Sequence, residues 1–142
     1  SSEMKYIILI SIFIFNTFVQ AESLPKLSNL DSLEWKNRVV ILNEIKNQDK
    51  SLLLLKEQVA QIDDRDIIWF SIKDNLVLSN YKGDLSSEFV TKIREKFSHL
   101  QNKVILIGKD GGIKSQSDYL NLEDIFSEVD SMPMRLFEIQ KR

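Results

Sequence analysis

The chain has 142 residues, of which 19 are basic and 21 acidic, and its formal net charge at pH 7 is −2. Binding to nucleic acid or to an anionic membrane surface depends on an excess of basic residues, so we expect neither partner. The sequence contains no cysteine, which excludes disulfides and thiol chemistry for this chain. The length favours a single domain.

The N-terminal stretch has the pattern of a secretory signal peptide. Met4 and Lys5 begin a positive segment, residues 6–18 are mainly apolar, and Val19-Gln20-Ala21 places small residues at a cleavage site. An uncleaved membrane anchor is the alternative, but a helix that spans about 30 Å of hydrocarbon needs about 20 residues. We therefore expect a signal peptide over residues 4–21, cleavage after Ala21, and an exported domain (periplasmic or secreted) over residues 22–142. After cleavage we expect no stable membrane insertion.

The first half of this domain contains two apolar runs that are typical of buried strands. We predict the strands at Arg38–Ile41 and Ile67–Ile72. Between them, apolar residues recur at helical spacing and predict one continuous helix. The predicted buried face of that helix consists of Leu52, Leu55, Val59 and Ile62. Residues 76–78 form either a short strand or a packed loop.

The second half begins with a predicted helix that has Ser86 as its N-cap. Its predicted buried face consists of Phe89, Ile93, Phe97 and Leu100. Near the C-terminus, Asn121 is the predicted N-cap of a further helix, and Pro133 is predicted to end it. The inward face of this last helix is predicted to be Leu122, Ile125, Phe126 and Val129.

The stretch Lys103–Lys114, with the sequence KVILIGKDGGIK, predicts a β-hairpin. Four consecutive apolar residues from Val104 to Ile107 indicate a strand that is covered on both faces. Gly111 and Gly112 suit the positive φ angles of a two-residue primed turn, and a second strand returns from Ile113.

The predicted order of elements is therefore β-α-β-α-β-β-α. A strand–helix–strand unit gives a parallel pair, and the hairpin adds an antiparallel strand. Amphipathic helices around aliphatic strands form a three-layer α/β sandwich with a mixed central sheet. This is the element order of the thioredoxin fold.

Four motifs, in this order and spacing, resemble a bacterial family known as domain of unknown function 4174. They are Trp35-Lys36-Asn37-Arg38, Arg65-Asp66, Leu106-Ile107-Gly108-Lys109-Asp110-Gly111-Gly112 with Lys114, and Asp130-Ser131-Met132-Pro133-Met134-Arg135. The resemblance covers nearly all of the mature chain. It implies a thioredoxin-like or peroxiredoxin-like fold, related to the C-terminal domains of extracellular sushi-repeat proteins, and an exported location, but no activity.

The chain departs from the redox members of that superfamily. Residues 43–48, which follow the first strand, contain neither a CxxC motif nor a peroxidatic cysteine. Residues 98–102 lack the proline that is cis beside a thioredoxin active site. Disulfide exchange needs a thiolate nucleophile, so thiol redox activity is excluded.

Three other kinds of site are also disfavoured, and we predict no catalytic, cofactor or metal residue. The only histidine, His99, has no cysteine partner for zinc. The Asp110-Gly111-Gly112 turn leads into a strand, whereas phosphate-binding loops lead into a helix. Asp63, Asp64 and Asp66 lack the glycine and distal glutamate of a calcium loop, so we expect a solvated turn that Arg65 neutralises.

The motif residues form our candidate binding or structural site. They are Arg38, Arg65, Asp66, Lys109, Asp110, Gly111, Gly112, Asp130, Met132, Pro133, Met134 and Arg135. Two interpretations of residues 132–135 stay open. One is a helix stop with methionines that fill the core. The other is a binding edge at which methionines flank an arginine able to hold a carboxylate through two hydrogen bonds.

We interpret the chain as a non-redox binding module for a protein or peptide. One alternative is an enzyme that works through Asp110, Asp130, Arg38 and Arg135. This alternative requires that these groups converge in a cleft with raised carboxylate pKa values. The other alternative is a degenerate member of a family of thiol oxidoreductases. We also expect Arg135 to pair with Asp130 or Asp110 and so to hold the C-terminal tail against the sheet edge.

Overall fold

The structure is a computed structural model, and it describes residues 24–142. The predicted signal peptide over residues 4–21 and its cleavage site therefore lie outside the described residues. Within residues 24–142, no helix combines the length and apolar character needed to cross a membrane.

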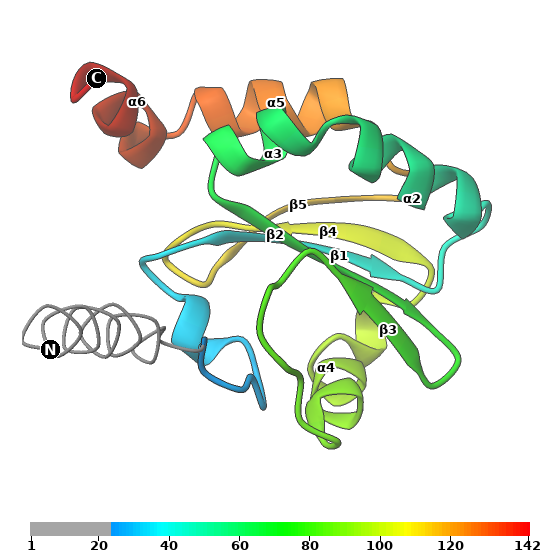
Figure 1. The fold of residues 1–142 in the computed structure, drawn as a ribbon. Helices are drawn as coiled ribbons and strands as arrows, with labels where there is room; N and C mark the ends of the chain where they lie inside the picture. Colours follow the sequence, from blue (N-terminus) through cyan, green and yellow to red (C-terminus); the bar gives the residue numbers. More distant parts are fainter. Residues whose placement is uncertain (1–23) are drawn as a thin grey trace, which may run out of the picture.

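The core of the fold is a five-stranded mixed sheet with the order β3-β2-β1-β4-β5 (Figure 1). β1 and β2 are parallel, and the other neighbouring pairs are antiparallel. The strands are β1 (Arg38–Asn43), β2 (Ile67–Lys73), β3 (Leu76–Ser79), β4 (Lys103–Ile107) and β5 (Ile113–Ser117). The predicted mixed sheet is confirmed, and residues 76–78 belong to an edge strand.

Helices cover both faces of the sheet (Figure 1). On one face lie α2 (Gln48–Glu57), α3 (Val59–Asp64) and α5 (Leu122–Asp130), and on the other lie α4 (Phe89–Lys96) and the short 3-10 turns η1 (Asp31–Leu33) and η2 (Ser98–Leu100). Successive side chains of a strand point to opposite faces, so Val39 and Ile41 join one apolar cluster and Val40 and Leu42 the other. This arrangement is the predicted three-layer sandwich.

Two helix predictions are wrong in detail. The helix predicted from Leu52 to Ile62 is two helices that meet at Gln58, and Val59 is 54% exposed because the break moves it off the buried face. Ser86 does not cap α4: the helix starts at Phe89, and the Ser86 hydroxyl has no hydrogen-bond partner among the described residues. Asn121 does cap α5, since its side chain accepts from the backbone N–H of Asp124 at 3.1 Å.

Pro133 does not end a helix but begins one. α5 ends at Asp130, and Pro133 is the first residue of α6 (Pro133–Gln140). Proline suits this position because the first amide of a helix has no intrahelical acceptor and the fixed φ of proline is helical. The C-terminal tail is therefore a helix, seen at the end of α5 in Figure 1.

Two buried amide side chains flank the β1–α2 connection, where we expected redox relatives to carry cysteine: Asn43 is the last residue of β1 and Gln48 is the first of α2. Asn43 donates to the carbonyl oxygens of Phe97 and Leu100. Gln48 donates to the Ser71 hydroxyl and to the Ile72 carbonyl oxygen. This connection therefore joins the first strand to its neighbours through hydrogen bonds.

The β4–β5 connection is longer than the predicted two-residue turn. It runs over residues 108–112, with hydrogen bonds from the Gly108 N–H to the Gly112 carbonyl and from the Gly111 N–H to the Gly108 carbonyl. Within this loop, only Gly111 has a positive φ, of 82°. The predicted positive φ at Gly112 is wrong because the longer loop needs one left-handed residue and not two.

We expect Gly111→Ala to lower the free energy of unfolding by about 1–3 kcal/mol, because alanine is strained at positive φ. A Cβ atom there would also lie 2.7 Å from the Glu34 carboxylate, although that flexible side chain is free to move. Gly112→Ala is the matched control, since its Cβ would meet the Asp110 carboxylate at an ordinary 3.4 Å. Urea unfolding of both variants tests this, and equal losses would contradict it.

Candidate functional site

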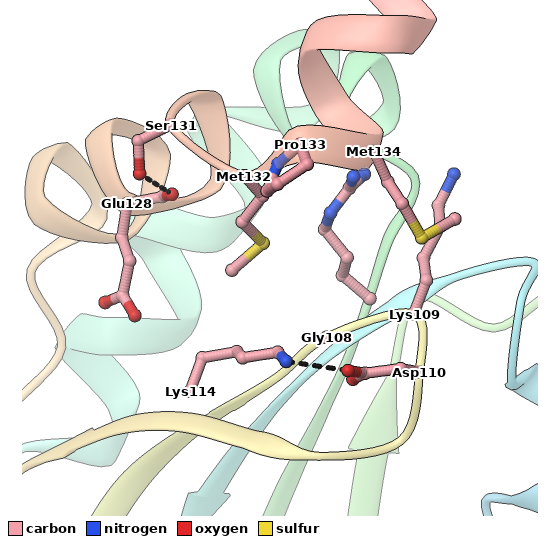
Figure 2. Close-up of a pocket in the computed structure, with 10 residues that line it drawn as sticks. Gly108, Lys109, Asp110, Lys114, Glu128, Ser131, Met132, Pro133 and Met134 are labelled. Atoms are coloured by element: carbon pink, nitrogen blue, oxygen red, sulfur yellow. Dashed lines mark hydrogen bonds and ion pairs between the residues drawn. The ribbon is translucent and has the colours of Figure 1, made fainter.

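A pocket of about 540 Å³ lies between the β4–β5 loop and the junction of α5 with α6 (Figure 2). The loop contributes one wall, and residues 131–134 contribute the opposite wall, with Met132 and Met134 directed toward the space between them. The lining residues are Arg38, Gly108, Lys109, Asp110, Lys114, Glu128, Ser131, Met132, Pro133 and Met134.

A second, apolar hollow of about 320 Å³ lies next to this pocket along α6. The two share Pro133 and Met134, and the second adds Phe137, Glu138 and Lys141. Phe137 is 63% exposed and Met134 39%. Together, the pocket and this hollow form what we call the α6 groove.

Two buried basic residues that line the pocket, Arg38 and Lys109, share the Glu138 carboxylate. Arg38 donates from Nη1 to the Arg65 carbonyl oxygen at 3.0 Å and to Glu138 at 3.1 Å. Lys109 pairs with Asp66 at 2.9 Å and also with Glu138. This cluster connects α6 to the starts of β1 and β2 and to the β4–β5 loop.

The remaining two motif arginines form a second ionic cluster at the ends of α3 and α5. Arg65 donates to both oxygens of Asp130, at 3.0 and 2.8 Å, and its guanidinium lies 4.5 Å from the centre of the Phe126 ring. Arg135 donates to Asp130 at 3.1 Å and to the Asp64 carboxylate at 2.7 Å.

The predicted Arg135–Asp130 pair is therefore present, and it fastens α6 to the ends of α3 and α5, not to the sheet edge. Asp110, the other partner we considered, pairs with Lys114 at 2.8 Å. Arg135 is not among the lining residues of the α6 groove, and its guanidinium already pairs with Asp64 and Asp130, so Arg135 does not fit the binding-edge interpretation. The interpretation of Arg65 as neutraliser of a solvated turn is also wrong, since Arg65 is only 9% exposed and faces Asp130.

Basic neighbours favour the ionised forms of three carboxylates in these clusters, Glu138, Asp130 and Asp64. For Glu138, burial opposes ionisation, but hydrogen bonds from Lys109 and Arg38 outweigh burial and lower the pKa. For Asp130, the hydrogen bond from Arg65 is the main cause of a lowered pKa. The Arg135 hydrogen bond has the same effect on the pKa of Asp64.

These shifts predict that acid weakens the attachment of α6. A carboxylate with a lowered folded-state pKa contributes stability that is present above its ordinary pKa, 4.5 for Glu138, and is lost as the pH falls through the lower folded value. We expect the thermal midpoint to fall between about pH 5 and pH 3. Compared with the wild type, Glu138→Gln should have a lower thermal midpoint at pH 7, and its midpoint should fall less as the pH is lowered. A fall as steep as that of the wild type would mean that Glu138 contributes nothing.

The structure thus divides the predicted site residues. Arg38, Lys109, Asp110 and the Met132–Met134 segment line the pocket, whereas Arg65, Asp130 and Arg135 form the cluster behind it. Asp66 does not line the pocket but contacts two residues that do, since its carboxylate pairs with Lys109 and its carbonyl oxygen accepts from the Arg38 N–H. Gly111 and Gly112 shape the loop without lining the pocket.

Sequence reasoning missed Asp64, Glu128 and Glu138 as members of the site. Glu138 lies three residues after Arg135 on one helix face, a spacing that has meaning only once residues 133–140 are known to be helical. Among the described residues, no group of three or more His, Asp or Glu side chains is arranged to hold a metal ion.

Fold and site together define a thioredoxin-like α/β domain without a thiol. The structure is similar to the solved structure of the mitochondrial 2-cys peroxiredoxin from Plasmodium falciparum. The similarity covers 79% of this chain and 82% of that chain, with a TM-score of 0.51 and 12% sequence identity. At this identity the likeness concerns the fold alone. Among curated proteins, none matches this chain in sequence. The chain belongs to the family described as Domain of unknown function (DUF4174), which it matches over residues 29–138.

Proposed function

We propose that this domain binds a protein or peptide segment in the α6 groove and carries out no redox chemistry. The observation that carries the proposal is that the 540 Å³ pocket and the apolar hollow along α6 lie next to each other and share Pro133 and Met134. Exposed apolar side chains beside a polar-lined cavity are typical of binding sites. The methionines support the proposal, because flexible thioethers adapt to varied ligand shapes.

The alternative of a carboxylate enzyme receives less support. A general acid at neutral pH needs a raised carboxylate pKa, but the hydrogen bond from Lys114 lowers the pKa of Asp110 and that from Arg65 lowers the pKa of Asp130. The two carboxylates also belong to separate ion pairs. This arrangement favours binding over acid–base catalysis.

Selection from a displayed peptide library, followed by fluorescence polarisation with the recovered peptides, tests the proposal. We expect Phe137→Glu to weaken binding at least about tenfold, because it places a charge on the apolar wall of the groove. Leu53→Glu is the matched control: Leu53 is 62% exposed on α2, away from the groove, and Phe137 is 63% exposed. Recovery of no peptides, or of peptides that bind both variants equally, would contradict the proposal.

We also propose that the domain acts outside the cytoplasm after export. The support is the sequence of residues 4–21, with its positive start, apolar stretch and Val19-Gln20-Ala21 site. N-terminal sequencing of the exported protein should give Glu22 as the first residue. An exported protein that still carries Met4 would contradict cleavage.

A further inference from the structure

The three buried motif arginines differ in how their guanidinium groups are used. Arg65 and Arg135 each donate to carboxylates from Nε and from Nη2. Arg38 is more deeply buried, at 1% exposure, and donates only from Nη1. Its Nε and Nη2 are shielded from solvent and have no partner among the described residues.

The two unpaired nitrogens of Arg38 form one edge of the planar guanidinium group. Their N–H bonds point the same way with a spacing that matches the two oxygens of a carboxylate. The Arg65–Asp130 pair shows the filled form of this edge, with distances of 3.0 and 2.8 Å. A buried donor without an acceptor costs free energy. A ligand that supplies acceptors to this edge of Arg38 would therefore bind more favourably.

Arg38 lines the pocket of the α6 groove, and the pocket has further features that suit an anion with an apolar body. Lys109 lines it as well, and its buried ammonium pairs with Asp66 and Glu138. α6 begins there with Pro133 and Met134, and its N-cap residue Met132 makes no capping hydrogen bond from its side chain. The positive end of the helix dipole therefore lies at the pocket without a capping group.

We propose that the pocket binds a carboxylate of the peptide ligand, with Arg38 Nε and Nη2 donating to its two oxygens. This proposal rests on the proposed function and adds the chemical group that is recognised. A singly charged group is favoured over a phosphate dianion, because Asp110 and Glu128 also line the pocket and Glu138 already pairs with Arg38. Since the Arg38 edge is covered, the ligand displaces a side chain on entry, and the exposed, flexible Met134 is suited to move.

The test uses an acetyl-Ala-Ala-Leu peptide with a free C-terminal carboxylate, the same peptide as a C-terminal amide, butanoate and inorganic phosphate. Binding is followed by calorimetry and by the NMR signal of the Arg38 Nε–H, which is assigned by its loss in Arg38→Lys. We expect the acid peptide to shift this signal and to bind at least about tenfold more tightly than the amide. Butanoate should bind more weakly than the acid peptide, and phosphate should not compete.

Arg38→Lys keeps the charge but removes the two-donor edge, and we expect it to bind both peptide forms equally. Because Arg38→Lys also changes contacts to Glu138 and Arg65, a second variant guards against misfolding. Met134→Glu should abolish binding of the acid peptide, since the new carboxylate repels the ligand or occupies the Arg38 edge. Leu136→Glu is its control, an exposed residue of α6 outside the pocket lining, and should bind as the wild type does.

The outcomes separate this proposal from the proposed function. Equal binding of acid and amide peptides by the wild type would overturn the carboxylate proposal and leave the peptide-binding function standing. Butanoate binding as tightly as the acid peptide would support the carboxylate site but overturn peptide binding. Competition by phosphate at equal concentration would overturn the preference for a carboxylate, and binding of no probe would overturn the proposal as a whole.

Discussion

Replacing Ile105 by alanine should lower the free energy of unfolding by about 2–5 kcal/mol, the usual cost of truncating a fully buried aliphatic side chain. Ile105 is 0% exposed in β4, where it pairs with Ile41 of β1 and belongs to the apolar cluster beneath α4. Removal of its branched side chain leaves a cavity that close-packed neighbours fill only in part.

Ile113→Ala is the control for this substitution. Ile113 lies in the edge strand β5, next to β4, and is 46% exposed, so the same change should cost about 1 kcal/mol or less. Urea unfolding of the two variants measures the contrast. Equal midpoints would place Ile105 outside the core and contradict the register of β4 against β1.

The second large effect is expected at Arg135, where alanine should cost about 2–4 kcal/mol, because it removes a buried side chain together with hydrogen bonds to charged partners. Arg135 is 3% exposed and donates to Asp130, to the Asp64 carboxylate and to the Asp64 carbonyl oxygen at 2.7 Å. Arg135→Lys keeps the charge but loses the planar fork, so we expect it to recover only part of the loss.

Arg142 offers a close comparison, since it also pairs with Asp64 but has a side chain that is 54% exposed. Surface ion pairs contribute about 0–1 kcal/mol, so Arg142→Ala should change the thermal midpoint little. Similar midpoints for Arg135→Ala and Arg142→Ala would show that burial adds nothing to the Arg135 contacts.

The sheet and its helices could be predicted because their sequences have clear apolar patterns. The unbroken apolar run from Val39 to Leu42 is typical of a buried strand. The recurrence of Phe89, Ile93 and Phe97 at every fourth residue is typical of a helix with one buried face. Two features were not predicted, the break at Gln58 and the helix that Pro133 begins, because the sequence pattern that marks each of them is short and weak.

The candidate site was only partly predictable for a different reason. The motifs identified the arginines that matter, but their sequence positions do not indicate which guanidinium meets an acidic partner in three dimensions. Arg135 was expected to pair with Asp130 or Asp110. It does pair with Asp130, but its second partner is Asp64, which the sequence did not indicate. Arg38, which sequence alone placed just at the start of a strand, is the arginine with an unfilled edge.

The buried amide of Gln48 has a consequence for protein engineering. Its nitrogen donates to the Ser71 hydroxyl, to the Ile72 carbonyl oxygen and, at 3.4 Å, to the Leu42 carbonyl oxygen. A cysteine grafted at this position would bring a single weak S–H donor, so hydrogen bonds to acceptors of two strands would be lost. Conversion of this scaffold into an oxidoreductase would therefore require a redesigned β1–α2 connection, in which new backbone partners for those carbonyls come before any catalytic sulfur.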